Sequence, residues 1–374
     1  MDLVAEMLSD RLAREHAKCF EVELVRPRFI WPSSYRVGKI TNERWVAAAR
    51  LFNRFVAYPR WIARNRSRFD IFHIVDHSYS HLIHYLPADR CVVTCHDLDT
   101  FRCLLDPDIE YRSWPFRAMT RRIFSGFRQA ARVNCDSSAI RDEVVRRGII
   151  PSERLEVVPI GVHPIFTPAA DPDADAEICR LLGRHTNDSI EILHVGSTQA
   201  RKRIDLLLRM FAAVRANFRD ARLIRVGGGL TKQNQQLAEQ LGVSDAIAIL
   251  PFLDRRILAA AYRRADVVVL PSEAEGFGLP IIEALACGVP VIASDLPVLR
   301  EVGGNAVRFC AVGDLDGWSR AIADVIRERD ADGGAHLERR ARATAHASRF
   351  SWSANAERAA LAYRELLDRA KPRT

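Results

Sequence analysis

Short apolar runs alternate with longer amphipathic stretches along the whole chain. In the first half, the runs that predict β-strands cover residues 20–24, 71–75, 91–95, 132–135 and 155–158. In the second half, they cover residues 190–195, 222–226, 246–250, 267–270 and 289–293. Apolar residues at helical spacing fill the gaps, for example over 204–217 and 257–264. This alternation predicts an α/β fold with two doubly wound, Rossmann-like parallel sheets.

A cluster of prolines, glycine and acidic residues between 159 and 175 predicts a linker, and the acidic stretch 171–177 ends it. We therefore expect an N-terminal Rossmann-like domain over 1–165 and a C-terminal one over 166–353. In a doubly wound sheet, ligands bind beyond the carboxyl ends of the strands. The residues that follow each strand are thus the first place to look for chemistry.

Length and composition narrow the class of protein. The 374 residues suffice for two domains, and 48% hydrophobic with 27% charged residues is a normal globular mixture. No apolar run is long enough to span a bilayer, and Asp2, Glu6 and Asp10 interrupt the first apolar stretch, which argues against a signal peptide. The eight cysteines are scattered without a CxxC pair, so we expect reduced thiols and a cytoplasmic protein.

The densest candidate site follows the apolar run 267–270. Gly276 and Gly278 leave the backbone open to close approach, and a helix is predicted to start near Leu279. The free N–H groups at such a helix start can bind an anion. Glu275 and Glu283 lie on either side of this turn, where their carboxylates could accept hydrogen bonds from hydroxyls that flank a diphosphate. The alternative is a buried helix with a solvated acidic loop.

A second candidate site follows the predicted strand 190–195. Gly196 is followed by two cations, Arg201 and Lys202, and then by a predicted helix. This order suits a diphosphate, whose charge is stabilised by backbone N–H groups and fixed cations. The alternative is a basic helix start on the surface. The glycine triplet 227–229 follows another strand, and either a nearby nucleotide base or a turn with positive φ would account for it.

The sequence EGFGLPIIEALACGVPVIAS, from Glu275 to Ser294, resembles the signature of the GT-B glycosyltransferases of family 4, which are retaining enzymes that use nucleotide sugars. The resemblance extends over nearly the whole chain. It implies that Glu275 contacts the donor sugar and that Glu283 binds the ribose diol. It also implies that the diphosphate and sugar meet the backbone of the turn Gly276, Phe277, Gly278 and Leu279. The predicted final helix, within 354–374, is then expected to pack on the first domain.

The resemblance also covers the second site. The family pattern has a glycine followed by arginine, and a lysine six residues after the glycine; Gly196 and Lys202 match it. Ser197 stands where the family has arginine, so Arg201 is expected to supply the second cation. We expect Gly196, Ser197, Arg201 and Lys202 to bind the donor, with Lys202 and Glu275 among the catalytic residues.

In the first domain, His96 ends a predicted apolar strand and resembles the histidine that reaches the donor sugar in family members. His77 follows the strand 71–75 and is a candidate on the acceptor side. The spacing of His73, His77, His81 and His84 suggests a metal-binding helix face, but His73 lies in a predicted strand and His77 in the turn that follows it, so the four do not share one helix. Because the glycine turns and cations already neutralise a diphosphate, we expect no required metal or other cofactor.

Two basic, aromatic-rich segments cover residues 44–68 and 112–132. They supply much of the net charge of +8. Such helices can lie on an anionic membrane surface, although ordinary helices with solvated arginines are the alternative. No nucleic-acid-binding module is recognisable, so we expect no nucleic-acid partner.

The resulting expectation is a retaining glycosyltransferase of polysaccharide biosynthesis that moves a sugar from a UDP- or GDP-sugar to a glycan or lipid-linked acceptor. Two alternatives stay open. One is an isomerase or phosphorylase on the same fold. The other is an inactive nucleotide-sugar-binding protein, because the chain opens inside what resembles the family's first helix, without the preceding strand and glycine turn.

Overall fold

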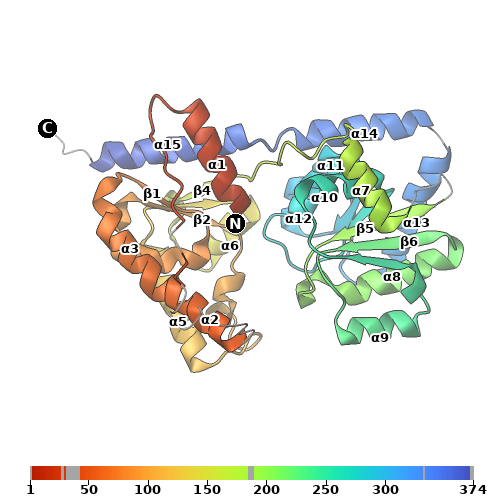
Figure 1. Cartoon of the computed structure of the whole chain (residues 1–374), viewed down its shortest axis with the longest axis horizontal. Helices are drawn as coiled ribbons and strands as arrows, with labels where there is room; N and C mark the ends of the chain where they lie inside the picture. The colour runs from red at the N-terminus through yellow and green to blue at the C-terminus, as the bar shows by residue number, and fades with distance from the viewer. Residues whose placement is uncertain (1, 27–28, 31–42, 184–188, 332, 371–374) are drawn as a thin grey trace. The chain divides into compact units, whose positions relative to one another are not determined.

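The computed structural model describes all residues except 1, 27–28, 31–42, 184–188, 332 and 371–374. The chain forms two compact units, one made of residues 1–160 with 352–374 and the other of residues 161–351. Each unit contains one parallel β-sheet with helices packed on its faces (Figure 1). The predicted α/β class with two Rossmann-like sheets is therefore confirmed.

The sheet of the first unit has the order β1-β2-β3-β4, and all neighbouring strands are parallel. The strands are β1 (Phe72–Ile74), β2 (Cys91–Cys95), β3 (Arg132–Cys135) and β4 (Leu155–Val157). Every residue of β2 is buried, as expected for a strand covered on both faces. All four strands were predicted to within two residues.

The prediction of a strand at residues 20–24 is wrong, because this segment pairs with no strand. It follows α1 (Asp2–Glu15), and its apolar side chains serve a different purpose. Phe20 and Val22 pack against the cluster formed by α1 and α15 (Trp352–Ala370), with the Phe20 ring edge-on to Tyr363 at 5.8 Å. Alternation alone cannot separate a strand from an extended segment that covers two helices.

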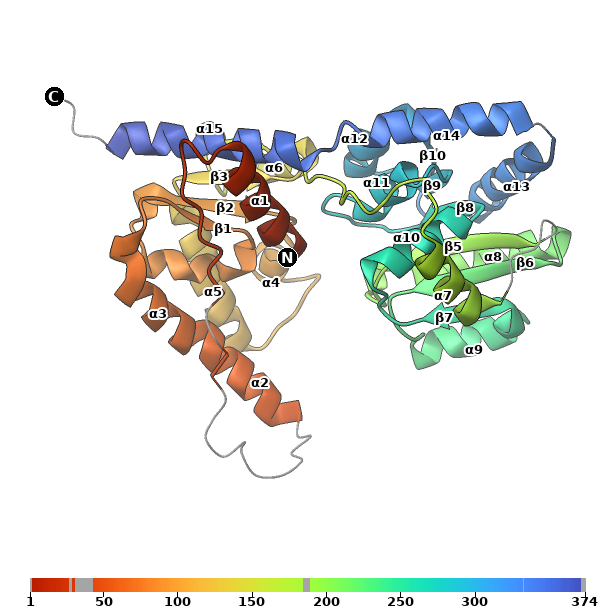
Figure 2. The same ribbon diagram turned by 45° about the horizontal axis from the view of Figure 1, so that its top comes forward.

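Helices cover both faces of this sheet (Figure 2). On one face lie α1 and α15, which contact each other. On the other face lie the 3-10 helix η4 (His77–Tyr85) and α5 (Trp114–Gln129). The remaining helices of the unit include α2 (Glu43–Phe52), the π-helix η2 (Asn53–Ala57), α3 (Tyr58–Asn65), α4 (Arg102–Leu105) and α6 (Ser138–Arg146).

The second unit has a six-stranded parallel sheet in the order β10-β9-β8-β5-β6-β7. Its strands are β5 (Ile190–Val195), β6 (Ala221–Val226), β7 (Ile247–Leu250), β8 (Val267–Leu270), β9 (Val291–Ser294) and β10 (Val307–Cys310). Strand β10 was not predicted, since it is a short edge strand in which two of four residues are only half-buried. The helices are α7 (Pro172–Leu182), α8 (Ile204–Asn217), α9 (Lys232–Gln240), α10 (Arg255–Arg264), α11 (Leu279–Ala286), α12 (Pro297–Gly303), α13 (Leu315–Ala331) and α14 (Gly333–Ala347).

The acidic stretch 171–177, predicted as linker, is instead the start of α7. Asp171 is the N-cap, and its carboxylate accepts a hydrogen bond from the Ala174 N–H at 3.3 Å. Pro172 occupies the first turn together with Asp173 and Asp175. Proline and acidic residues both favour a helix N-terminus, so the same composition is compatible with a linker and with the start of a helix.

The strand order reverses between β5 and β8. From β5 the chain proceeds outward to β6 and β7, and from β8 it proceeds in the opposite direction to β9 and β10. Ligands of doubly wound sheets bind outside the carboxyl ends of the strands at such a reversal point. The loops that follow β5 and β8 are therefore the ones that the fold places at the site.

Candidate functional site

The loops after β5 and β8 meet through both backbone and side chains. The Glu273 N–H donates to the Arg201 carbonyl at 2.8 Å. Lys202 Nζ lies 2.5 Å from Glu275 Oε1, and Arg201 Nη1 lies 3.2 Å from Glu275 Oε2. The structure thus brings Glu275 onto Arg201 and Lys202, two predicted site residues that lie 74 and 73 positions before it in the sequence.

Glu275 is held by more than the two cations. Its side chain is only 7% exposed, and its Oε1 also accepts a hydrogen bond from the Ser272 hydroxyl at 2.7 Å. Arg201 donates to the Ala274 carbonyl as well, at 2.9 Å, so one guanidinium holds both the side chain and the backbone of this loop. Two cations face one carboxylate, which leaves a positive excess that suits an anionic ligand.

The loop after β5 also lies against the loop after β6. The Gly196 N–H donates to the Val226 carbonyl at 2.9 Å, and Ser197 follows in the same loop, half-buried. A Cβ on Gly227, where φ is +119°, would lie 2.1 Å from the Gly196 carbonyl oxygen. Glycine is thus required here both by a positive φ and by the contact between two backbones. This accounts for Gly227 without a nucleotide base.

Arg225, which was not predicted from the sequence, forms hydrogen bonds with both of these loops. It is fully buried in β6, donates from Nη2 to the Gly196 carbonyl at 3.3 Å, and donates from Nη1 to the Gly228 carbonyl. Among the described residues, no carboxylate lies within ion-pair distance of it. An arginine inside the apolar run before a glycine triplet is the signal that could have identified it.

His194 lies on β5 opposite Arg225 and is also fully buried. Burial lowers its pKa to about 3, and the nearby charges of Arg225 and Lys202 act in the same direction. The ring is therefore neutral at pH 7. Its Cε1 would lie 3.3 Å from a Cβ on Gly196, so the His194 ring packs directly against the glycine loop.

The helix start predicted near Leu279 is present. Gly278 is the N-cap of α11 with φ of +94°, and a Cβ there would lie 2.8 Å from Leu299 Cδ2. Phe277 is buried, and its ring packs edge-on against Phe350 at 5.8 Å. The turn from Gly276 to Leu279 is thus anchored by packing, with the start of α11 close behind it.

Glu283 lies one turn into α11 and is paired with a residue that sequence reasoning missed. The hydroxyl of Tyr262, which is fully buried on α10, donates to Glu283 Oε2 at 2.8 Å. Burial raises the pKa of Glu283 to about 7, although the Tyr262 hydrogen bond and the charge of Arg255 oppose the shift. The carboxyl group of Glu283 therefore changes its ionisation near neutral pH. The pairing with Tyr262 could not be predicted, because a tyrosine in the helix before β8 is too common a feature to indicate it.

In the first unit, His77 and His96 form a separate cluster with Asp136 at the carboxyl ends of β1, β2 and β3. His96 Nδ1 lies 2.6 Å from Asp136 Oδ2, and His96 Nε2 donates to the Val75 carbonyl at 2.8 Å. All three residues are buried. Burial disfavours the charged ring, but the Asp136 carboxylate outweighs it and raises the pKa of His96 to about 9.

This arrangement uses both ring nitrogens of His96, so the ring is held as a charged group inside the unit. His77 lies beside it, with its Nε2 3.6 Å from the Asp97 carboxylate. Asp136 was missed by sequence reasoning. The signal was an aspartate directly after an apolar strand and before Ser137, the N-cap of α6.

The other histidines of the spaced set have separate partners. His73 bonds with Tyr363 and Thr94, His81 with the Arg54 carbonyl, and His84 with the Arg122 carbonyl. Within the part of the chain that the structure describes, no group of three or more histidine, cysteine or acidic side chains could hold a metal ion. The eight cysteines are all free; six are buried, and Cys19 and Cys179 are exposed.

Two family models together match most of the chain. "Glycosyltransferase Family 4" matches residues 4–166, and "Glycosyl transferases group 1" matches residues 183–349. The chain belongs to the GT-B glycosyltransferases of family 4. This GT-B chain is 38% identical over 232 residues to the D-inositol 3-phosphate glycosyltransferase of Thermobispora bispora, an alignment that covers 59% of this chain and 52% of that protein. The chain thus spans about half the length of the curated relatives it matches.

Solved structures of low sequence identity share the GT-B fold. Sucrose-phosphate synthase from Thermosynechococcus elongatus superposes with a TM-score of 0.67 at 22% identity, covering 90% of this chain and 83% of that one. HepE from Anabaena, in complex with UDP-glucose, superposes with a TM-score of 0.68 at 17% identity, covering 84% of each chain.

Proposed function

We propose that this protein is a retaining glycosyltransferase that moves a sugar from a nucleotide diphosphate sugar to a hydroxyl of a glycan or lipid-linked acceptor. The observation that carries the proposal is the buried cluster of Arg201, Lys202 and Glu275 beside the start of α11, at the reversal point of a doubly wound sheet. The resemblance of the Glu275 to Ser294 segment to the family signature supports the same assignment.

Each group of the cluster has a role in this proposal. Arg201, Lys202 and the N–H groups at the start of α11 bind the diphosphate, and Glu275 accepts hydrogen bonds from the sugar. Glu283 holds the ribose diol. In the transfer step the bond from the anomeric carbon to the phosphate oxygen breaks, and a bond to the acceptor oxygen forms on the same face. The leaving phosphate takes the acceptor proton, so the protein's main task is to stabilise the developing negative charge.

The donor class is supported by fold and charge. HepE, which shares the fold, was solved with UDP-glucose. A diphosphate needs two cations or their equivalent, and Arg201 and Lys202 supply them, so we propose that no metal is required. In the first unit we assign His96 to the donor sugar and His77 to the acceptor side, because both follow strands at the carboxyl ends of the sheet. Both ring nitrogens of His96 are bonded within the unit, so a contact of this ring with the sugar requires the bond to the Val75 carbonyl to be given up.

We also propose that the first unit contacts an anionic membrane that carries the acceptor, at its cytoplasmic face. The support is a set of exposed large hydrophobic side chains among arginines, namely Trp45, Leu51 and Phe52 of α2, Tyr111 in the segment before α5, and Trp114 and Phe116 at the start of α5. Both helices lie on the face of the sheet opposite α15 (Figure 1, Figure 2). The side chain of Arg44, the first cation of the predicted basic segment, lies outside the described residues. Among the described helices, none combines the length and hydropathy needed to cross a membrane.

The experiment that tests the proposal measures thermal unfolding and donor hydrolysis of the whole chain with a panel of UDP- and GDP-sugars. A ligand that binds the native state raises the unfolding temperature, so we expect a rise with at least one donor and none with the Lys202→Ala variant. Arg209→Ala, an exposed cation on α8, is the matched control. Epimerisation without acceptor, phosphorolysis, or binding without turnover would each favour one of the alternative functions, and no response to any donor would contradict the assignment.

A further inference from the structure

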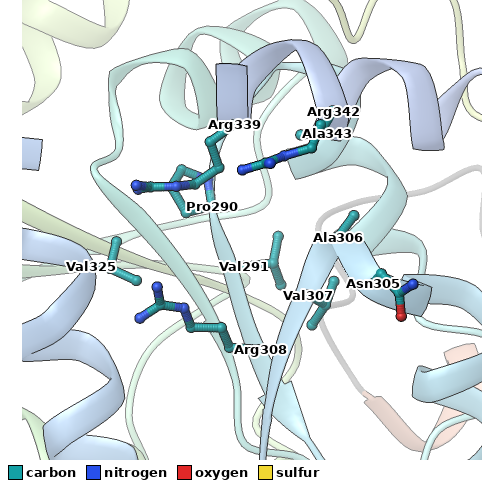
Figure 3. Close-up of a pocket in the computed structure, with 10 residues that line it drawn as sticks. All are labelled: Pro290, Val291, Asn305, Ala306, Val307, Arg308, Val325, Arg339, Arg342 and Ala343. Carbon is teal, nitrogen blue, oxygen red and sulfur yellow. The ribbon is translucent and has the colours of Figure 1, made fainter. Parts of the chain in front are cut away.

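A pocket of about 180 Å³ opens in the second unit at the amino ends of β9 and β10 (Figure 3). Its floor is apolar and includes Val291, Val307 and Val325. The proposed donor site lies beyond the carboxyl ends of β5 and β8, whereas this pocket lies at the amino ends of strands of the same sheet. The pocket is therefore a separate feature, and it is not explained by the donor site.

Three arginines surround this apolar floor. Arg308 comes from β10, while Arg339 and Arg342 come from α14, and Figure 3 shows Arg339 and Arg342 above Val291 and Arg308 below it. Among the residues that the structure describes, the one carboxylate that pairs with them is Glu328, which contacts Arg308 and, at 2.9 Å, Arg339 Nη2. Three cations and one carboxylate leave the rim with a positive excess.

Two donor groups of this rim have no acceptor among the described residues. Arg339 Nη1 is buried without a hydrogen-bond partner. Arg342 has no ion pair or hydrogen bond with any residue that the structure describes, although its neighbour on the helix, Arg339, is paired. Buried N–H groups are almost always satisfied, so an acceptor from a ligand is the simplest account of Arg339 Nη1.

We propose that this pocket binds a small organic phosphate. Guanidinium groups bind phosphate oxygens through paired hydrogen bonds, and the apolar floor suits a short carbon body. The volume equals that of about six water molecules, which admits a phosphate group and a few carbon atoms but not a nucleotide sugar. This proposal is independent of the function proposed for the donor site.

Binding should be visible in the stability of the whole unit. Helix α14, which supplies two of the arginines, packs on α11 and α13 and is hydrogen-bonded to α12. His346 Nε2 donates to the Val302 carbonyl at 2.7 Å, and the Arg340 side chain lies against Gly288. A phosphate bound by arginines of both α14 and β10 therefore stabilises the position of α14, against which α11 packs. Binding should thus raise the unfolding temperature.

The test is isothermal titration of the whole chain with inorganic phosphate and with glycerol 3-phosphate, together with thermal unfolding. We expect saturable binding in the wild type and an affinity at least about tenfold lower in Arg342→Ala, the loss expected for a hydrogen bond to a charged group. Arg342 is exposed and unpaired, so this change should leave the fold intact. Arg320→Ala, which removes an exposed arginine on α13, is the matched control.

Two further variants make the result decisive. Lys202→Ala should keep the phosphate binding, because Lys202 belongs to the donor site. Arg339→Gln should weaken binding as Arg342→Ala does. The proposal is overturned if no saturable binding is found. It is also overturned if Arg342→Ala binds like the wild type, or if Lys202→Ala alone abolishes binding.

Discussion

Lys202 Nζ and Glu275 Oε1 lie 2.5 Å apart, although 73 residues separate them along the chain. One residue follows β5 and the other follows β8, so the ion pair exists only because the sheet reverses its strand order at this point. Both side chains are less than a tenth exposed. The same two residues are the centre of the proposed donor site.

The first prediction concerns this pair. Lys202→Ala and Glu275→Ala should each lower the rate of sugar transfer at least about 100-fold, the scale of losing one preorganised charge contact in an active site. Turnover is measured at a temperature below the unfolding transition of each variant, because removing one partner of a buried pair also destabilises the fold. Near-normal rates in both variants would contradict the assignment of Lys202 and Glu275 to the donor site. The control variant Arg209→Ala should have the rate of the wild type.

Arg225 gives a second prediction. Because it holds the carbonyls of Gly196 and Gly228 and adds a buried positive charge, Arg225→Met should weaken binding of a nucleotide diphosphate roughly tenfold. Binding of the nucleoside without phosphates should change little. Titration calorimetry with UDP and uridine makes the comparison, with Arg222→Met on the same strand as control. Equal losses for both ligands would indicate a structural effect only.

The ionisation of Glu283 predicts a pH dependence of donor binding. Its carboxylate accepts ribose hydroxyls best when it is ionised, and its pKa is raised to about 7. Donor affinity should therefore fall as the pH decreases below 7. Tyr262→Phe removes a hydrogen bond that lowers this pKa, so the fall should begin at a higher pH. Donor affinity measured between pH 5.5 and 9 with buffers of equal ionic strength tests this, and identical profiles for both proteins would contradict it.

Glu283 should also affect stability, with a defined sign. Its pKa in the folded protein lies above the ordinary value of 4.5, so the folded state retains a proton that the unfolded state loses. The stabilising contribution is complete below about pH 4.5 and is lost as the pH rises through about 7. The difference in unfolding free energy between the wild type and Glu283→Gln, measured by urea denaturation, should change over this range and be constant above it.

The pair of His96 and Asp136 predicts a pH effect at the alkaline end. Asp136→Asn leaves a buried histidine without its carboxylate, which should cost about 3 kcal/mol of unfolding free energy near pH 7. Because the pKa of His96 is raised to about 9, the stabilisation from the pair is present below pH 6.5 and is lost as the pH rises through 9. Denaturation of both proteins from pH 6 to 10 tests this, and a difference that does not shrink above pH 9 would show that the charge is not responsible.

The exposed aromatic side chains predict binding to anionic vesicles. Trp114→Ser combined with Phe116→Ser removes two large exposed apolar groups from α5 and should reduce the fraction that sediments with anionic vesicles severalfold. Neutral vesicles should bind the wild type weakly, because the arginines contribute only at an anionic surface. Phe252→Ser, which removes a 77% exposed phenylalanine from the second unit, is the matched control. Equal sedimentation of all variants would contradict the proposed membrane contact.

The sequence by itself determined the local elements and the composition of the loops. All strands of both sheets except β10 were predicted, because buried parallel strands are short apolar runs and need no distant information. The glycines, cations and carboxylates after β5 and β8 were also visible. Their chemistry is carried by a few consecutive residues, as in the turn before α11.

Only the tertiary structure decided which of these loops meet, because strand order depends on long-range packing. It brought Lys202 into contact with Glu275, Tyr262 with Glu283 and Asp136 with His96, and the two residues of each pair are far apart in the sequence. It also decided where ambiguous patterns go: residues 20–24 cover two helices, and residues 171–177 start a third. Local pattern specifies what a segment can form, whereas burial and charge are properties of its neighbours, and these are known only once the chain has folded.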